Sequence, residues 1–152
     1  MDRTCGQFLK KTVELYIHKK ERFKLAIIIR EAKVEDAAQI AYVQVKSWQS
    51  TYKGIVAADY LTALNVKERE ERWAQIISSA QSLNDVAVTE QGTIVGFASG
   101  GKERTKKYNI EAELYAIYIL RDYQGMGIGT QLIKRLTKSL LEHDWHSLLI
   151  WV

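Results

Sequence analysis

The spacing of apolar residues predicts that strands and helices alternate along most of the chain. The apolar run at 25–29 is typical of a first strand. Apolar residues then recur at helical spacing in three segments, at 34–48, 59–64 and 67–80. We therefore expect one strand followed by three helices in the first half of the chain.

The second half alternates shorter apolar runs with turn residues. Asn84-Asp85 is expected to turn the chain, and the runs at 86–89 and 93–99 predict two strands around Gln91-Gly92, which is a hairpin signal. Gly100-Gly101 is expected to begin another loop. These features predict a β-hairpin in the middle of the chain.

A long strand, a helix and a last strand complete the predicted order. Residues 110–120 form the longest predicted strand, and the amphipathic repeat at 132–140 predicts a helix that His143-Asp144 closes. Residues 147–152 are expected to form a final apolar strand. The order β-α-α-α-β-β-β-α-β predicts a single α/β (α+β) domain, which suits a length of 152 residues.

Residues 1–24 differ from the rest of the chain in charge. Residues 1–30 hold eight Lys or Arg and three Asp or Glu, whereas the remainder holds fourteen and fifteen. Apolar residues about a helical turn apart fit either a short amphipathic helix or a disordered tail. We therefore expect 1–24 to be a basic N-terminal extension of a domain that spans 25–152.

Composition excludes several classes of protein. A single cysteine, Cys5, cannot form an internal disulfide framework and suits the reducing cytoplasm, where we expect the protein to be. No apolar run approaches the roughly 20 residues that cross a bilayer, so we expect no membrane association. The basic cluster at 102–107 is interpreted as a solvated hairpin tip, so no nucleic-acid partner is expected.

Candidate chemistry is concentrated between the long strand and the helix that follows it. The chain passes from Arg121-Asp122 through Gln124-Gly125-Met126-Gly127-Ile128-Gly129 into the amphipathic repeat. Alternating glycines let a backbone or a ligand approach closely, and the helix points free N–H groups and its positive dipole end into the loop. Such a corner binds phosphate.

The spacing within the loop decides between phosphate ligands. A dinucleotide fingerprint needs glycine three residues after Gly127, where Thr130 stands. A nucleoside triphosphate loop needs Gly-Lys-Ser/Thr, and Gly129-Thr130-Gln131 lacks the lysine. Both classes are therefore excluded.

The pattern that fits is Gln/Arg-x-x-Gly-x-Gly/Ala, met by Gln124, Gly127 and Gly129. With Glu113-Leu-Tyr-Ala-Ile-Tyr-Ile before it and Leu132-Ile-Lys-Arg-Leu after it, this segment resembles the acyl-CoA pyrophosphate loop of the GNAT superfamily of N-acetyltransferases. A glycine-rich turn in an unrelated α/β protein is the alternative.

The resemblance implies a GNAT-like mixed, mostly antiparallel sheet flanked by helices over about 25–152. GNAT domains normally continue with a helix and two more strands, whereas this sequence stops near the fifth strand. The resemblance therefore implies that these elements are lacking, or are replaced by the N-terminal segment or another subunit. The apolar edge at 148–152 invites strand pairing, so a homodimer or strand-exchanged assembly is expected.

The resemblance also implies acetyl-CoA as cofactor. Its pantetheine arm would lie between 117–120 and 149–152, with a backbone N–H near Ile119 polarising the thioester carbonyl. The three histidines offer no metal-ligand spacing, so no metal is expected. The expected cofactor-binding residues are Ile117, Tyr118, Ile119, Gln124, Gly125, Met126, Gly127, Ile128, Gly129 and Thr130.

Acetyl transfer to an amine needs a group that accepts the ammonium proton, and Glu113 is the candidate base. It lies fourteen residues before Gly127, the spacing at which some family members place a glutamate base, and Tyr115 and Ile117 are expected to share its face. Glu113 is otherwise a rim carboxylate that binds a cationic substrate, or an ion-pair partner. Tyr115 and Tyr118 are acid or substrate contacts, or aromatic wall residues.

Trp48 and Tyr52 are expected to line the acceptor pocket, although such aromatics also serve as core residues. The sequence thus predicts an N-acetyltransferase that transfers acetyl from acetyl-CoA to a primary amine, on a small molecule or peptide, by direct attack in a ternary complex. The alternative is a truncated GNAT-fold module that binds acyl-CoA or oligomerises with little turnover. A basic-tailed nucleic-acid binder is the third hypothesis.

Overall fold

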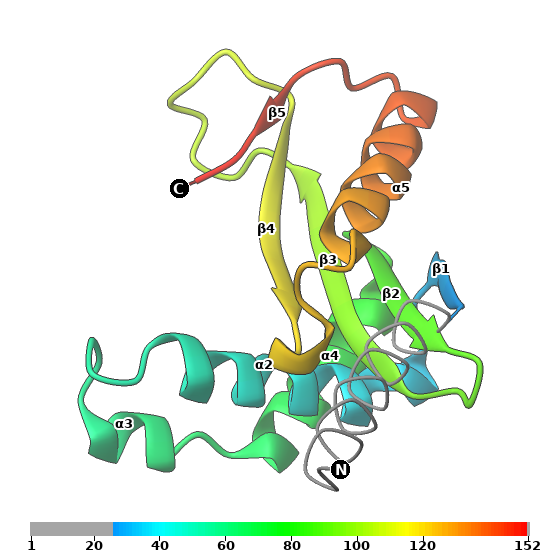
Figure 1. The fold of residues 1–152 in the computed structure, drawn as a ribbon. Coiled ribbons are helices and arrows are strands. Elements are labelled where there is room, and N and C mark those ends of the chain that lie inside the picture. Colours follow the sequence, from blue (N-terminus) through cyan, green and yellow to red (C-terminus); the bar gives the residue numbers. More distant parts are fainter. Residues whose placement is uncertain (1–25, 152) are drawn as a thin grey trace, which may run out of the picture.

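The computed structural model describes residues 26–151, which form a five-stranded sheet with helices on both faces (Figure 1). The helix or tail proposed for 1–24 lies outside these residues. The strands lie in the order β1-β2-β3-β4-β5. They are β1 (Ile27–Glu31), β2 (Leu83–Thr89), β3 (Ile94–Lys102), β4 (Ala112–Ile119) and β5 (Leu148–Leu149).

The first four strands pair antiparallel, and β5 pairs parallel to β4. The predicted mixed, mostly antiparallel sheet is therefore confirmed. The hairpin between β2 and β3 turns at Gly92, whose φ is +84°. None of the helices in the described part of the chain is both long and apolar enough to span a bilayer.

Two layers of helices cover the sheet. On one face, the short η1 (Val34–Asp36) leads into α2 (Ala37–Thr51), which packs with α3 (Ala58–Thr62) and α4 (Val66–Ser79). On the other face lies α5 (Ile128–Glu142), which follows the short η2 (Arg121–Tyr123). Asn65 caps α4 by accepting hydrogen bonds from the backbone N–H groups of Lys67 and Glu68. All three helices predicted between the first two strands are present.

Each face of the sheet has its own apolar core. Ile40, Trp73 and Phe97 meet on the α2 and α4 side, with the rings of Trp73 and Phe97 edge to face at 4.9 Å. Leu132 and Leu136 of α5 are fully buried on the other side. Since burying a leucine side chain contributes about 1.5–3 kcal/mol, the periodic leucines stabilise the packing of α5 on the sheet.

Two loops predicted from the sequence are strands in the structure. Asn84 and Asp85 do not turn the chain but lie buried within β2, where Asn84 accepts from the Ser99 hydroxyl and Asp85 from the Arg135 guanidinium. Gly100 and Gly101 extend β3 because side chains of neighbouring elements fill the space above them: a Cβ on Gly100 would lie 3.0 Å from Leu136.

The last strand is shorter than predicted. The strand was predicted over 147–152, and among the described residues 147–151 only Leu148 and Leu149 pair with β4, opposite Ala112 and Glu113. Ile150 and Trp151 are exposed. Beyond Glu113, therefore, the edge of β4 is not paired with any described strand.

A β-bulge in β4 overturns one expectation about side-chain faces. Ser99 pairs with Ala116 and Gly100 with Leu114, so Tyr115 is an extra residue in β4. The bulge inverts the alternation, so that Ile117 packs on the α5 side with Leu114, whereas Glu113 shares the α2 side with Tyr118. The prediction that Glu113 and Ile117 share one face is therefore wrong, whereas Tyr115, which lies over the cross-strand partner of Glu113, stays on the same side as Glu113.

Candidate active site

The glycine loop forms the corner between β4 and α5. Gly127 is the N-cap of α5 with φ +76°, and Gly125 has φ +73°, conformations that favour glycine. A Cβ on either residue would meet nothing within 4 Å, so both face open space. The first intrahelical bond runs from the N–H of Gln131 to the carbonyl of Gly127. The N–H groups of Ile128, Gly129 and Thr130 therefore precede the helical ladder and remain available to an anion.

Gln124 and Gly129 bind the loop to the end of β4. The Gln124 side-chain amide donates to the carbonyl of Ile119 at 3.0 Å. A Cβ on Gly129 would lie 3.4 Å from the Ile119 side chain, so the first turn of α5 packs directly on the strand. Of the loop residues, Ile128 is buried, whereas Thr130 is exposed at the mouth of the corner.

The unpaired edge of β4 carries free backbone donors. The N–H of Leu120 donates to Val95 of β3. Because successive N–H groups of a strand point to opposite edges, those of Ile117 and Ile119 point away from β3, toward the side where β5 has already diverged. An extended ligand can therefore bind along this edge as an added strand.

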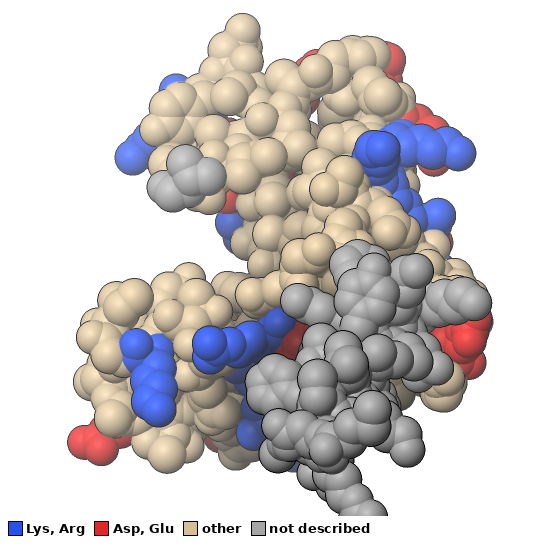
Figure 2. Space-filling view, in the orientation of Figure 1, with Lys and Arg blue, Asp and Glu red and all other residues tan. Residues whose placement is uncertain are grey.

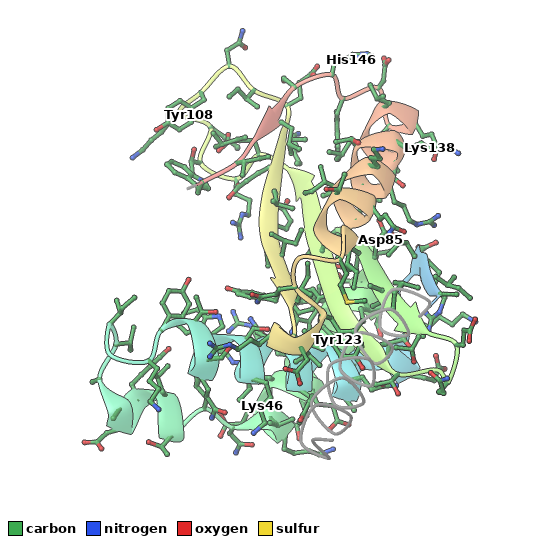
Figure 3. All side chains as sticks on the ribbon, in the orientation of Figure 1. Lys46, Asp85, Tyr108, Tyr123, Lys138 and His146 are labelled. Atoms are coloured by element: carbon green, nitrogen blue, oxygen red, sulfur yellow. The ribbon has the colours of Figure 1, made fainter. Side chains whose placement is uncertain are left out.

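A deep notch opens beside β4. Figure 2 shows it between the part of the molecule built from α2 and α3 and the part that carries β5 and the 103–111 loop, and its visible walls are largely uncharged. Tyr108 lies on that loop (Figure 3). Its ring meets Trp151 edge to face at 5.9 Å. The notch therefore exposes one side of β4.

Glu113 lies buried and ion-paired at the start of this opening. Arg104 donates to its carboxylate from the backbone N–H, Nε and Nη2, at 3.2, 3.1 and 2.7 Å. Only 3% of the Glu113 side chain is exposed, against 60% of Arg104. The hydrogen bonds from Arg104 hold the pKa of Glu113 below its ordinary value, although burial opposes this effect. Glu113 is therefore ionised at neutral pH.

Tyr115 supports the same arrangement. Its hydroxyl donates to the carbonyl of Lys102 at 2.6 Å, and the guanidinium of Arg104 lies 4.1 Å from the centre of its ring. Burial is the main cause that raises the pKa of Tyr115, so its hydroxyl stays protonated at neutral pH.

On the opposite wall, Trp48 joins α2 to β4. Its Nε1–H donates to the Tyr118 hydroxyl at 2.8 Å, and its ring lies 4.9 Å from Tyr52 and 6.4 Å from Tyr60. Burial raises the pKa of Tyr118. The two aromatic residues predicted for the acceptor pocket, Trp48 and Tyr52, thus lie together and reach the strand that carries Glu113.

Arg104 is the site residue that sequence reasoning missed. The cluster at 102–107 was interpreted as a solvated hairpin tip, and most of it is exposed. The sequence signal that could have indicated this ion pair is a basic residue nine positions before Glu113, in a strand-loop-strand segment. Arg135, by contrast, pairs with Asp85 at 2.7 Å on the α5 side of the sheet. Within residues 26–151, no group of three or more His, Cys, Asp or Glu is suited to hold a metal ion.

Comparison with known proteins places this geometry in a family. Residues 42–152 match the model of the acetyltransferase (GNAT) family. The chain is 41% identical over 128 residues to the uncharacterized N-acetyltransferase YuaI of Bacillus subtilis, covering 83% of this chain and 71% of YuaI.

Solved structures agree with this assignment. The PaiA N-acetyltransferase of Thermoplasma acidophilum, in complex with coenzyme A, superposes with a TM-score of 0.70 at 25% identity, over 84% of this chain and 80% of its own. A GNAT family acetyltransferase of Brucella melitensis, in complex with acetyl-CoA, shares the fold with a TM-score of 0.59 at 23% identity, over 82% and 75% of the two chains. The chain belongs to the GNAT family of acetyl-CoA-dependent N-acetyltransferases.

Proposed function

We propose that this protein transfers the acetyl group of acetyl-CoA directly to a primary amine while both substrates are bound. The observation that carries the proposal is the combination of an open glycine corner at the N-terminus of α5, residues 125–130, with an unpaired donor edge on β4. Coenzyme A needs both features, because its pyrophosphate is anionic and its pantetheine arm is extended and amide-bearing.

The cofactor is proposed to run from the N-terminus of α5 along β4. Backbone N–H groups between Gln124 and Thr130 bind the pyrophosphate, and the residues 117–119 contact the pantetheine arm. The N–H of Ile119 is the proposed donor to the thioester carbonyl, where it stabilises the oxyanion that develops as the amine attacks. Complexes of relatives with coenzyme A and acetyl-CoA support this choice of cofactor.

Glu113 is proposed to accept, through intervening water, the proton that the amine must lose. The amine nitrogen forms a bond to the carbonyl carbon, the carbon–sulfur bond breaks, and coenzyme A leaves as a thiolate that takes up a proton from the Tyr118 hydroxyl, which water then reprotonates. Arg104 keeps Glu113 ionised at neutral pH, so the carboxylate is ready to receive a proton and to pass it on to water. Tyr115 keeps Arg104 and Glu113 in place, and Tyr118 lies on the same side of the sheet as a hydroxyl donor.

The acceptor is proposed to enter the notch between Trp48 and Tyr52 on one side and the 103–111 loop on the other. Aromatic side chains there offer apolar contact to the carbon skeleton of an amine, with the reactive nitrogen directed to β4.

Calorimetric titration of acetyl-CoA, CoA and dephospho-CoA tests the cofactor site, and thiol release with a panel of amines tests transfer. We expect a dissociation constant of about 1–100 μM for acetyl-CoA and amine-dependent release of CoA. Absence of acetyl-CoA binding would refute the site, and binding without transfer to any amine would refute the enzymatic function.

The ion pair of Glu113 favours one alternative. A carboxylate that already accepts three hydrogen bonds from Arg104 is a weak base, which suits a module that binds acyl-CoA or oligomerises with little turnover. The exposed Ile150 and Trp151 beside the short β5 would then pair with a second copy of the chain. Analytical ultracentrifugation tests the assembly, since a monomer at working concentration contradicts it, and the amine panel above tests turnover.

A further inference from the structure

Arg104 determines which charge the notch presents beside β4. Its guanidinium covers a carboxylate that is itself almost fully buried, while more than half of the arginine side chain remains exposed. An incoming substrate therefore meets a guanidinium at this point and not the carboxylate of Glu113.

Hydrogen bonds within the 103–111 loop fix the backbone that carries this guanidinium. The Glu103 carboxylate accepts from the backbone N–H groups of Thr105 and Lys106 at 2.6 and 2.7 Å, and the Glu103 N–H donates to Glu111 at 2.9 Å. Glu113 accepts from the Arg104 N–H. Both neighbours of Arg104 and its own backbone are thus fixed, so little conformational entropy remains to be lost when its side chain binds a ligand.

The outer edge of the guanidinium is available for binding. Arg104 uses Nε and Nη2 for Glu113, whereas Nη1 makes no hydrogen bond within residues 26–151. The stacking of the guanidinium on the Tyr115 ring keeps its plane fixed. A planar, immobile guanidinium with free N–H groups matches the geometry of a carboxylate.

The arrangement of the ion pair disfavours a second ammonium group on the acceptor. The carboxylate of Glu113 is buried and already accepts three hydrogen bonds from Arg104, whereas the guanidinium is exposed. An amine that carries a carboxylate would gain an ion pair with this guanidinium, and a diamine would not.

We infer that Arg104 sets the acceptor class of the transfer proposed above, selecting amines that also carry a carboxylate over polyamines. The carboxylate binds the free edge of the Arg104 guanidinium, and the amine at the other end of the molecule reaches the thioester. This inference rests on the proposed function, whereas the test below reads acceptor binding separately from acetyl transfer.

The test compares ω-amino carboxylates of four to six carbons with diamines of the same lengths. Their affinities for the CoA-bound protein are measured by calorimetry, and the Arg104 Nε–H signal is followed by NMR. We expect the amino carboxylates to bind about 10-fold more tightly than the diamines and to shift the Arg104 signal. Arg104→Gln should abolish this preference, and Arg104→Lys should restore part of it.

Arg135→Gln is the matched control, because Arg135 also pairs with a buried carboxylate but on the α5 side of the sheet; Asp85, its partner, is labelled in Figure 3. This variant should retain the preference. Equal or tighter binding of diamines by the wild-type protein, or binding of neither class, would overturn the inference. So would an unchanged preference in an Arg104→Gln protein that still binds acetyl-CoA.

Discussion

The indole Nε1–H of Trp48 donates a hydrogen bond to the hydroxyl oxygen of Tyr118 across 2.8 Å, joining α2 to β4. Because an indole can only donate, the oxygen of Tyr118 is the acceptor and its own hydrogen points elsewhere. No acceptor for that hydrogen is present within residues 26–151. Tyr118 is therefore held as a donor that a substrate or leaving group can use.

This arrangement predicts that Tyr118→Phe lowers kcat by about 10- to 100-fold, because the proton donor is lost. Trp48→Phe keeps the aromatic volume but releases the hydroxyl, so we expect a smaller loss of about 5- to 10-fold. Steady-state assays of thiol release measure both effects. Tyr42→Phe, an exposed tyrosine on α2, is the control and should behave as wild type; a Tyr118→Phe enzyme with full kcat would contradict the assignment.

For Glu113, the prediction concerns the pH dependence of the rate. The pKa of Glu113 lies below the ordinary value of 4.5, so the carboxylate is lost only when the pH falls through this lowered pKa. We expect wild-type activity to show an acidic limb in that range, and Glu113→Gln to lower the rate by about 100-fold and remove the limb. A rate profile that is the same in Glu113→Gln as in wild type would exclude Glu113 as base.

The glycine corner is predicted to require its positive φ. Gly127→Val forces a branched side chain into a left-handed conformation, at a cost of about 1–2 kcal/mol, and projects it into the space proposed for the pyrophosphate. We expect loss of CoA affinity of at least about 100-fold by calorimetry. Gly92→Val has a similar φ and open surroundings in the β2–β3 hairpin, so it should lose stability but keep affinity.

Stability should depend on an ion pair at the start of α2. Arg30 donates to both oxygens of Asp36 at 2.6 and 2.9 Å, and these bonds are the main cause that lowers the pKa of Asp36 below 3.8. A depressed folded-state pKa adds stability above the unfolded value, and this contribution disappears as the pH falls through the folded value.

Asp36→Asn should therefore lower Tm at pH 7, and the difference from wild type should shrink as the pH falls below 3.8 and through the lowered pKa of Asp36. Thermal melts followed by circular dichroism across this range measure the effect. Glu35→Gln, at the exposed neighbouring position, is the control. A difference between Asp36→Asn and wild type that stays the same as the pH falls below 3.8 would show that packing, not ionisation, is responsible.

The parts of the structure that the sequence predicted are those governed by local rules. The repeat of Leu132, Leu136 and Leu140 predicts α5 because helical spacing places all three on the sheet. Gly127 predicts the corner because few other residues adopt its φ.

The parts that could not be predicted depend on contacts between distant residues. Asn84-Asp85 has the composition of a turn, yet Ser99 and Arg135 satisfy its side chains inside the sheet. The bulge at Tyr115 leaves no sequence signal, and it decides which side of the sheet receives Glu113. The role of Arg104 follows from the conformation of the 103–111 loop, which alternation of apolar residues does not describe.

The unpaired edge of β4 also has a consequence for amide hydrogen exchange. The amides of Ile117 and Ile119 lie on a part of β4 that pairs on one side only, and they point to the side where β5 has diverged. They should exchange with deuterium far faster than the amides of Tyr118 and Leu120, which point toward β3. Acetyl-CoA should then slow the exchange of the Ile117 and Ile119 amides selectively. Loss of the alternating exchange rates along β4 on adding acetyl-CoA would indicate that the cofactor binds as an additional strand.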